Sequence, residues 1–457
     1  MTLPSLQLVH HLLSLTEDSV DPRLFQQAQL ALLDNVGCGL FGSIQPWGKI
    51  TREFALSEAA KGHATLLGSD QGLTPARVAF ANGTATHGFE LDDIVQGALV
   101  HPGAVVVSAA LAIAEEYDVS GQRLLLGIIA GYEMMARLGL ALGAQHNTQG
   151  FHTTGVAGSV ASVVACAVVL KMEVDQVLSA IGIACSMSSG IKAFTQGTGG
   201  MVKRMHAGQA AESGVVACEL AKRGFTGPQA GIDGRYGLLS VIGGHDIRPE
   251  ALNEHLGTSF AIDHIWVKAY PCCGLLHSSA HALEALKQEH RITPDQVQEI
   301  QIHSGERAIE QNSNTNPREP MTAQYSLEFC AGVSLAKDAR DPQAYAQDQL
   351  DDPGVRALLA KTRLFVDQDM ESLFPAHFAA RVVVKTTGGA SFEKTVIDPK
   401  GTDADPLTPQ EIDEKFERLA RPVKTAQAIQ HIKSLSKELV QSPTMKQFSA
   451  ALRQGNL

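Results

Sequence analysis

Five short stretches of the sequence place titratable side chains beside glycine or proline residues. Histidines titrate near neutral pH and can move protons, while lysine and arginine side chains neutralise carboxylates. Each stretch alone is more typical of a structural role, but together they fit a pocket for a small polycarboxylate. The stretches are Asp92–Asp93, His101–Gly103, Phe151–Gly155, Lys203–His206 and Tyr270–His277.

The segment Gly197–Gly208 reads as a glycine-rich turn that leads into a helix. Such a turn lets a ligand approach the backbone, and the free N–H groups of the helix start face an anion. Lys203 and His206 are three residues apart and share one helix face. We expect Lys203 to be the principal charge of the pocket, and Arg204 and His206 to hold the helix or a dimer surface.

A pocket of this kind suits chemistry at the carbon next to a carboxylate. That carbon is weakly acidic, so an enzyme must stabilise the developing enediolate with fixed positive charge and a positioned base. Two acid/base groups on opposite faces then allow loss of water, decarboxylation or inversion. The sequence contains no HExxH motif, so we expect no metal here.

Composition excludes other classes of function. A net charge of −11 over 457 residues argues against a nucleic-acid partner. The longest apolar run, Val156–Leu170, is interrupted by serines and is shorter than the roughly 20 residues that cross a bilayer, so we expect a buried helix and no membrane partner. Seven cysteines without a CxxC pair, and no signal peptide at Met1–Pro4, favour a cytoplasmic protein.

Helical patterns dominate the first part of the chain. A helix is predicted from Asp21–Pro22 until glycines at 37, 39 and 42 end it. Up to about residue 265 nothing alternates like a strand. Further helices are predicted over Ala76–Asp93, Ala104–Glu116, Leu124–Leu142, Gly155–Leu170, Val174–Gly190 and Gln209–Arg223.

Mixed patterns follow. After a helix at His277–Glu289, strands are predicted at 300–303, 381–386 and 392–397, the last two joined by a turn at Gly388–Gly389. A capping box at Thr408–Glu411 begins a helical tail. We therefore predict a mainly α fold, with a large all-helical domain over 1–266 plus 406–457 and an inserted, smaller α+β lid domain over 267–405.

Six phrases of the sequence, in this order, resemble the MmgE/PrpD family. That family includes 2-methylcitrate dehydratase, cis-aconitate decarboxylase and iminodisuccinate epimerase. The phrases lie in Asn82–Asp93, His101–Gly103, Gly150–Gly155, Lys203–Gly208, Arg223–Pro228 and Tyr270–Cys273.

The resemblance implies a homodimer and cofactor-free chemistry on small di- or tricarboxylates. It makes His101 and His152 the candidates for proton transfer, with Lys203 also in the catalytic set. His277 would complete the site when the lid closes. Substrate binding would fall to Asp93, Lys268 and Tyr325.

One departure concerns the residue after the acidic pair. Many dehydratase and decarboxylase members have threonine there, whereas this chain has Ile94, which cannot donate a hydrogen bond. Dehydration of a 2-methylcitrate-like hydroxy acid is the reaction we expect first. The alternatives are decarboxylation of a cis-aconitate-like acid, epimerisation of an amino- or imino-dicarboxylate, and, from another class, a carboxylate-binding protein without turnover.

Overall fold

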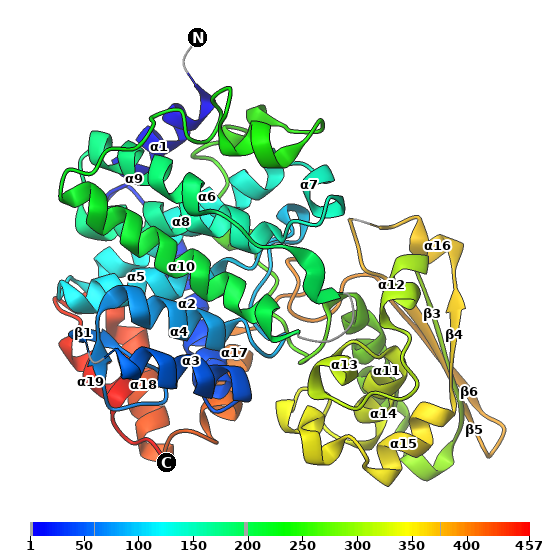
Figure 1. Ribbon diagram of the computed structural model, residues 1–457. Helices are drawn as coiled ribbons and strands as arrows, with labels where there is room; N and C mark the ends of the chain where they lie inside the picture. Colours follow the sequence, from blue (N-terminus) through cyan, green and yellow to red (C-terminus); the bar gives the residue numbers. More distant parts are fainter. Residues whose placement is uncertain (1–2, 59, 196–199, 375) are drawn as a thin grey trace. The chain divides into compact units, whose positions relative to one another are not determined.

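The computed structural model describes residues 3–58, 60–195, 200–374 and 376–457. Contacts within the chain group it into two compact units, which are best described one at a time (Figure 1). The first unit runs to Gly88 and also contains Asp92–Ile265 and Pro409–Leu457. The second unit contains Phe89–Leu91 and Trp266–Thr408. Helices make up most of the described chain, which confirms the mainly α fold class.

The first unit is built from helices with small side chains at their contacts. Two of them, α6 and α8, have the length and hydropathy of membrane spans, yet 94% of each apolar window is buried inside the unit, as in a core helix. The helices are α1 (Pro4–Ser14), α2 (Pro22–Ser43), α3 (Pro46–Ser57), α4 (Pro75–Thr86), α5 (Pro102–Glu116), α6 (Gly121–Ala141), α7 (Gln145–Thr148), α8 (Thr153–Leu170), α9 (Val174–Met187), α10 (Met201–Lys222), α17 (Pro409–Ala420), α18 (Ala426–Glu438) and α19 (Lys446–Arg453).

Helix α2 begins where the sequence predicts but ends later. The Asp21 side chain accepts a hydrogen bond from the Arg23 N–H and caps the helix, as its position before Pro22 indicated. The prediction that glycines end α2 is wrong, because the helix continues to Ser43. A Cβ on Gly42 would lie 1.9 Å from the carbonyl oxygen of Ala85, so this glycine allows α4 to pack closely.

Helix α4 is shorter than predicted. It ends at Thr86, so the acidic residues from Glu90 to Asp93 lie in the following loop instead of at a helix end. Within this loop Glu90 has a positive φ of 56°. Because the acidic residues lie outside a helix, helix geometry does not fix their positions, which depend on tertiary contacts.

A small sheet in the first unit corrects a second prediction. Strands β1 (Lys61–Thr65) and β2 (Gly72–Leu73) pair antiparallel, although the sequence before residue 265 shows no alternation. The buried carboxylate of Glu115 on α5 accepts hydrogen bonds from the N–H and the hydroxyl of Thr65, each at 2.6 Å. A contact 50 residues away therefore supports a strand that local patterning does not indicate.

The second unit packs helices on a four-stranded sheet with the order β4-β3-β5-β6. Strand β4 runs parallel to β3, and the other pairs are antiparallel. The expected turn at Gly388–Gly389 joins β5 and β6, whereas β4 was not predicted. The elements are α11 (His277–His290), β3 (Val297–Ser304), α12 (Glu306–Asn312), α13 (Pro320–Gln324), α14 (Leu327–Ala336), α15 (Pro353–Ala360), β4 (Thr362–Val366), α16 (Gln368–Glu371), β5 (Ala380–Thr386) and β6 (Ser391–Val396).

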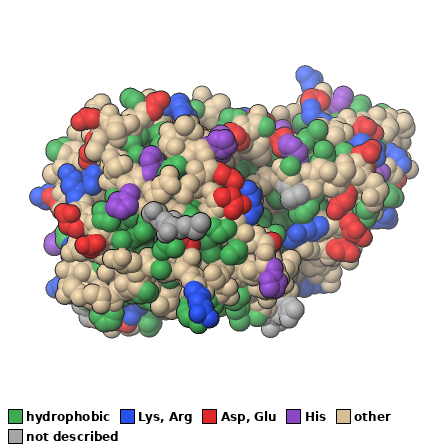
Figure 2. Space-filling model, turned by 90° about the horizontal axis from the view of Figure 1, so that it is seen from above, with side chains coloured by type: hydrophobic (Ala, Val, Ile, Leu, Met, Phe, Trp, Pro, Cys, Tyr) green, Lys and Arg blue, Asp and Glu red, His purple; other side chains and the backbone are tan. Residues whose placement is uncertain are grey.

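The face of the molecule shown in Figure 2 carries charges of both signs. On the face seen in Figure 2, basic side chains lie scattered among acidic and uncharged ones. Nucleic-acid binding needs basic side chains gathered into one patch or stripe. Among the described residues of this face no such patch is visible.

Candidate active site

Three helix N-termini of the first unit bring together the predicted residues His101, His152 and Lys203. His101 directly precedes α5, His152 directly precedes α8, and Lys203 lies in the first turn of α10. The N–H of His101 donates to the hydroxyl of Thr154 at 3.2 Å, which ties the first two of these helix starts together. N-terminal helix ends favour anions, so this arrangement suits a negatively charged ligand.

Four imidazole rings form a continuous row in the first unit, here called the histidine row: His101, His87, His152 and His206. The centroid distances between successive rings are 4.9, 5.7 and 5.2 Å. Phe194 packs edge-on against His152 and His206, with centroids 5.6 and 5.8 Å away. The row therefore consists of buried, mutually touching rings that come from four separate segments of the chain.

The inner end of the row is uncharged at neutral pH. Burial, together with the charges of His87 and Lys203, holds the pKa of His152 well below its usual range. Burial also lowers the pKa of His206 to about 4, again helped by His87 and Lys203. The two Nδ1 atoms lie 3.0 Å apart and share a hydrogen bond. Both rings are thus neutral, and the ring that donates this hydrogen bond keeps its lone pair on Nε2, where it can accept a proton.

His206 and Arg204 have different surroundings. Two roles were expected for His206, holding the helix or a dimer surface; it is 7% exposed and contacts His152, which fits the interior of the unit better than a surface. Arg204 donates to the carbonyl of Gly88 at 2.7 Å and stacks over Trp47 at 4.1 Å, consistent with the expected role in holding the helix. The predicted turn at 197–199 lies outside the described residues.

His101 is oriented by the loop that precedes it. Its Nδ1 lies 2.9 Å from the carbonyl oxygen of Asp93 and 3.6 Å from a carboxylate oxygen of Asp92. A carbonyl oxygen only accepts hydrogen bonds, so Nδ1 carries the proton and the neutral ring has its lone pair on Nε2. This tautomer gives His101 a basic nitrogen on the side away from the loop.

Asp93 turns into the helical core. It is 0% exposed, and its carboxylate accepts hydrogen bonds from the Gly103 N–H at 2.8 Å, from Asn35 at 3.3 Å and from the Tyr132 hydroxyl. Burial raises its pKa to about 7, although these donors act in the opposite direction. The contacts make Asp93 an anchor for the segment that carries His101.

A buried ion pair lies near the acidic loop. Asp34 of α2 and Lys415 of α17 approach to 2.7 Å. Burial, opposed by Lys415, raises the pKa of Asp34 above its ordinary value, and Asp92 adds to the rise. Burial alone would lower the pKa of Lys415, but Asp34, Cys38 and Asp93 raise it. The C-terminal segment thus supplies positive charge to a group of buried carboxylates.

The second unit carries the other predicted residues. The Lys268 ammonium lies 3.5 Å from a carboxylate oxygen of Glu90. His277 is 0% exposed, and its Nε2 donates to the carbonyl of Cys272 at 3.2 Å. Its ring packs edge-on against Trp266 and Tyr270 at 5.0 and 5.3 Å. Tyr325 follows α13 directly.

Gln324, beside Tyr325, was not predicted to have a role. Its side-chain amide donates to the carbonyls of Phe89 and Pro271, both at 2.8 Å, and its backbone carbonyl accepts from the Cys273 N–H at 3.0 Å. It therefore joins three distant segments of the second unit. In the sequence, only its position next to the candidate residue Tyr325 points to a role for Gln324.

His87 is the main residue that the sequence did not indicate. It lies 2.6 Å from a carboxylate oxygen of Asp92, and both side chains are 1% exposed. The two residues are five positions apart with Gly88 between them, which is a weak signal on its own. Only the fold shows that His87 lies in the middle of the histidine row.

A metal ion would find ligand atoms at one end of the row. One atom each from His87, Asp92 and His101 lie within 4.8 Å of one another. Two imidazoles and a carboxylate suit several divalent metals. However, the Nδ1 atoms of both histidines donate hydrogen bonds to oxygen acceptors, and a nitrogen must lose that proton before it can bind a metal.

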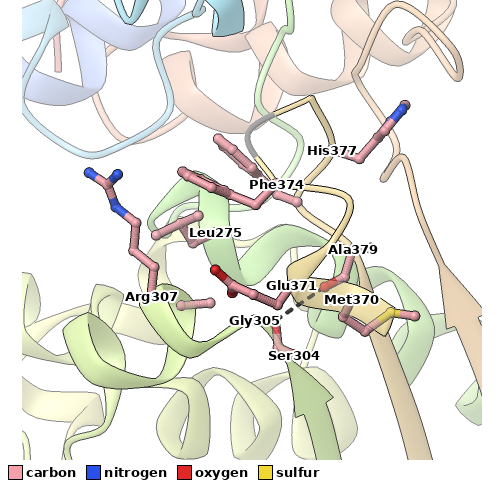
Figure 3. Close-up of a pocket in the computed structure, with 11 residues that line it drawn as sticks. Leu275, Ser304, Gly305, Arg307, Met370, Glu371, Phe374, His377 and Ala379 are labelled. Atoms are coloured by element: carbon pink, nitrogen blue, oxygen red, sulfur yellow. Dashed lines mark hydrogen bonds between the residues drawn. The ribbon is translucent and has the colours of Figure 1, made fainter. Parts of the chain in front are cut away.

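The second unit also contains a small pocket. Figure 3 shows Leu275, Arg307, Glu371, Phe374 and His377 around it, drawn from several segments. Its volume of about 10 Å³ is enough for one water molecule and too small for a tricarboxylate. None of the described residues that line it belongs to the predicted site.

Comparisons with known protein families identify the family of this chain. The MmgE/PrpD N-terminal domain model matches residues 6–250, and the MmgE/PrpD C-terminal domain model matches residues 270–439. The chain belongs to the MmgE/PrpD family.

Relatives align along almost the whole chain. A cis-aconitate decarboxylase-like protein, oryM, of Aspergillus oryzae is 28% identical over 98% of this chain and 96% of its own length. The cis-aconitate decarboxylase of Aspergillus terreus is 26% identical, covering 94% of this chain and 91% of that protein. The human cis-aconitate decarboxylase is 25% identical, covering 91% and 88%.

Proposed function

We propose that this enzyme is a lyase that acts by acid/base chemistry next to a carboxylate of a small di- or tricarboxylate, and that its preferred reaction is decarboxylation of a cis-aconitate-like acid. The observation that carries the proposal is the histidine row with Lys203 at three helix N-termini. The names of the relatives favour decarboxylation over the reaction expected first from the sequence.

Decarboxylation needs fixed positive charge and one proton. The bond between one carboxylate and the carbon beside the double bond breaks, its electron pair forms a new carbon–carbon double bond, and the pair of the former double bond moves to the far carbon. The far carbon then takes a proton as carbon dioxide leaves. Lys203 and the helix N-termini would hold the remaining carboxylates and stabilise the developing charge. A ring of the histidine row would supply the proton.

Ile94 does not separate the candidate reactions. It is 9% exposed and cannot donate a hydrogen bond, and it replaces a threonine that is common in dehydratase and decarboxylase members alike. Dehydration of a 2-methylcitrate-like acid is the second candidate, because one of the neutral rings of His152 and His206 can remove a proton from carbon. Epimerisation would use the same first step.

Proton NMR in D₂O tests the proposal on a panel of cis-aconitate, 2-methylcitrate and an imino-dicarboxylate. Decarboxylation yields a product with one carboxylate fewer and one deuterium on carbon. Dehydration yields an alkene, and epimerisation only exchanges the proton next to the carboxylate. Tight binding of an acid without product in any arm would favour the binding protein instead.

Variants test the site. Replacing His101 with Asn or Lys203 with Met should lower kcat/KM by about two orders of magnitude or more. Lys222→Met is the matched control, since Lys222 lies at the other end of α10 and bonds Tyr117. Unchanged kcat/KM in both site variants would sink the assignment.

The remaining expectations stay part of the proposal. Lys268 and Tyr325 are proposed to bind substrate, and His277 to take part in catalysis. We also propose a cytoplasmic homodimer that works without a cofactor. Light scattering tests the dimer, and activity after exhaustive chelation tests the cofactor.

A further inference from the structure

His87 occupies a central position in the histidine row. Its backbone N–H donates to the carbonyl of Gly83 at 3.1 Å, where it caps the end of α4. Its ring centroid is 4.9 Å from that of His101 and 5.7 Å from that of His152. Because the His87 ring lies next to both candidate proton-transfer residues, a substrate that contacts them can also contact His87.

The hydrogen bonds of His87 leave one ring nitrogen for a ligand. An ionised carboxylate only accepts hydrogen bonds, so the Nδ1 that lies 2.6 Å from Asp92 carries a proton. The other nitrogen, Nε2, is buried and has no hydrogen-bond partner among the described residues. Leaving a buried polar atom unpaired is unfavourable, which points to a partner supplied by a bound molecule.

We propose that His87 is a further catalytic residue, which contacts the substrate through Nε2, and that Asp92 is its positioning residue. The inference rests on the proposed function and deepens it. Asp92 holds the proton on Nδ1 and compensates the positive charge when Nε2 also takes a proton. The Asp92–His87 pair is therefore suited to hold a proton on Nε2 and to give it to the substrate.

The proton step balances for decarboxylation. His87 begins the cycle protonated on both ring nitrogens, and this imidazolium lies against the Asp92 carboxylate. The carbon–carboxylate bond of the substrate breaks, its electron pair shifts through the double bond, and the far carbon takes the proton from Nε2. Carbon dioxide leaves, one proton is consumed per turnover, and His87 is left in the neutral form.

The experiment compares the wild-type enzyme with His87→Gln and Asp92→Asn. Glutamine retains a hydrogen-bonding side chain but cannot relay a proton at neutral pH. His11→Gln is the matched control, because His11 of α1 also has a buried Nε2 without a partner among the described residues. Turnover of cis-aconitate, the solvent deuterium isotope effect on kcat and calorimetric binding of propane-1,2,3-tricarboxylate are measured for each.

The expected result separates catalysis from folding. His87→Gln should lower kcat at least 100-fold and raise the isotope effect, while the analogue Kd changes less than threefold. Asp92→Asn should lower kcat at least tenfold, again with a change of less than threefold in the Kd of the analogue. This variant replaces His87→Gln as the test if His87→Gln does not fold. His11→Gln should retain the wild-type kcat.

Three outcomes would overturn the inference. If the wild-type enzyme turns over cis-aconitate and the kcat of His87→Gln is within threefold of the wild-type kcat, His87 is not catalytic and the proposed function stands. A wild-type enzyme that turns over none of the acids would overturn the proposed function and this inference with it. Wild-type activity that chelation abolishes and a divalent cation restores would make His87 a metal ligand instead.

Discussion

The Nδ1 atoms of His152 and His206 lie 3.0 Å apart, so one ring donates the hydrogen bond that the other accepts. A neutral imidazole carries one ring proton, so the two rings must be opposite tautomers. One ring therefore presents an Nε2 lone pair and the other an Nε2–H. His206 thus decides which proton-transfer role is open to His152.

Replacing His206 with Phe should test this relationship. The ring volume remains while the hydrogen bond to His152 is lost, so we expect kcat to fall about tenfold or more with a smaller change in KM. Steady-state kinetics on the acid that the wild-type enzyme converts provides the measurement. Gln209→Ala, at an exposed position of the same helix, is the control. Equal kinetics for both variants would show that His206 does not orient His152.

The same variant should change acid stability. The folded state holds the pKa of His206 at about 4, below its ordinary 6.5, so the unfolded chain binds a proton first. Stability is therefore lost as the pH falls from about 6.5 to about 4. His206→Phe should lose less stability than wild type over this range, with His152 supplying the rest. Urea unfolding at several pH values measures it, and parallel curves would contradict the prediction.

Asp93 should act in the opposite direction. Burial raises its pKa from 3.8 to about 7, so the folded state keeps a proton that the unfolded chain releases. Stability should therefore fall as the pH rises from about 4 to about 7, by on the order of 4 kcal/mol for this group at its upper limit. Asp93→Asn lacks the titration, so its stability relative to wild type should rise over this range. The exposed Asp18→Asn serves as control, and a constant difference between wild type and Asp93→Asn would refute the shift.

Breaking the buried ion pair between α2 and α17 should be costly. Lys415→Met leaves Asp34 buried without its counter-charge, and we expect a loss of about 3–5 kcal/mol in the free energy of unfolding. Adding Asp34→Asn should recover more than half of the loss. Lys437→Met is the control, since Lys437 pairs with Asp413 but is 65% exposed. A single variant no less stable than this control would contradict the prediction.

The packing of α10 on α4 should not tolerate a methyl group at Gly208. A Cβ there would lie 2.2 Å from the Phe80 carbonyl oxygen and 2.2 Å from the Thr84 hydroxyl. Gly208→Ala should therefore destabilise the protein by about 1–3 kcal/mol through overpacking. At Gly97 the nearest atom is 3.8 Å away, so Gly97→Ala is the matched control. Thermal unfolding measures the stability of both variants, and a Gly208→Ala protein as stable as Gly97→Ala would contradict the prediction.

The helix starts could be predicted because their signals are local. Asp21 with Pro22, and proline at the start of α5 and α17, satisfy or remove N–H groups within one turn. Helix ends and the small sheet could not be predicted in the same way. Gly42 serves a contact with α4, and β1 depends on Glu115, so distant residues override the local preference.

The sequence by itself identified the family phrases and, in the first unit, the candidate residues His101, His152 and Lys203. They could be found without a structure because a histidine or lysine next to residues that start a helix is a local signal. Tertiary structure decided how they are joined. His87 and His206 enter the histidine row only because the end of α4 and the first turns of α10 reach the starts of α5 and α8. Tautomers, burial and shifted pKa values follow from these contacts, and contacts between distant segments are a property of the folded chain.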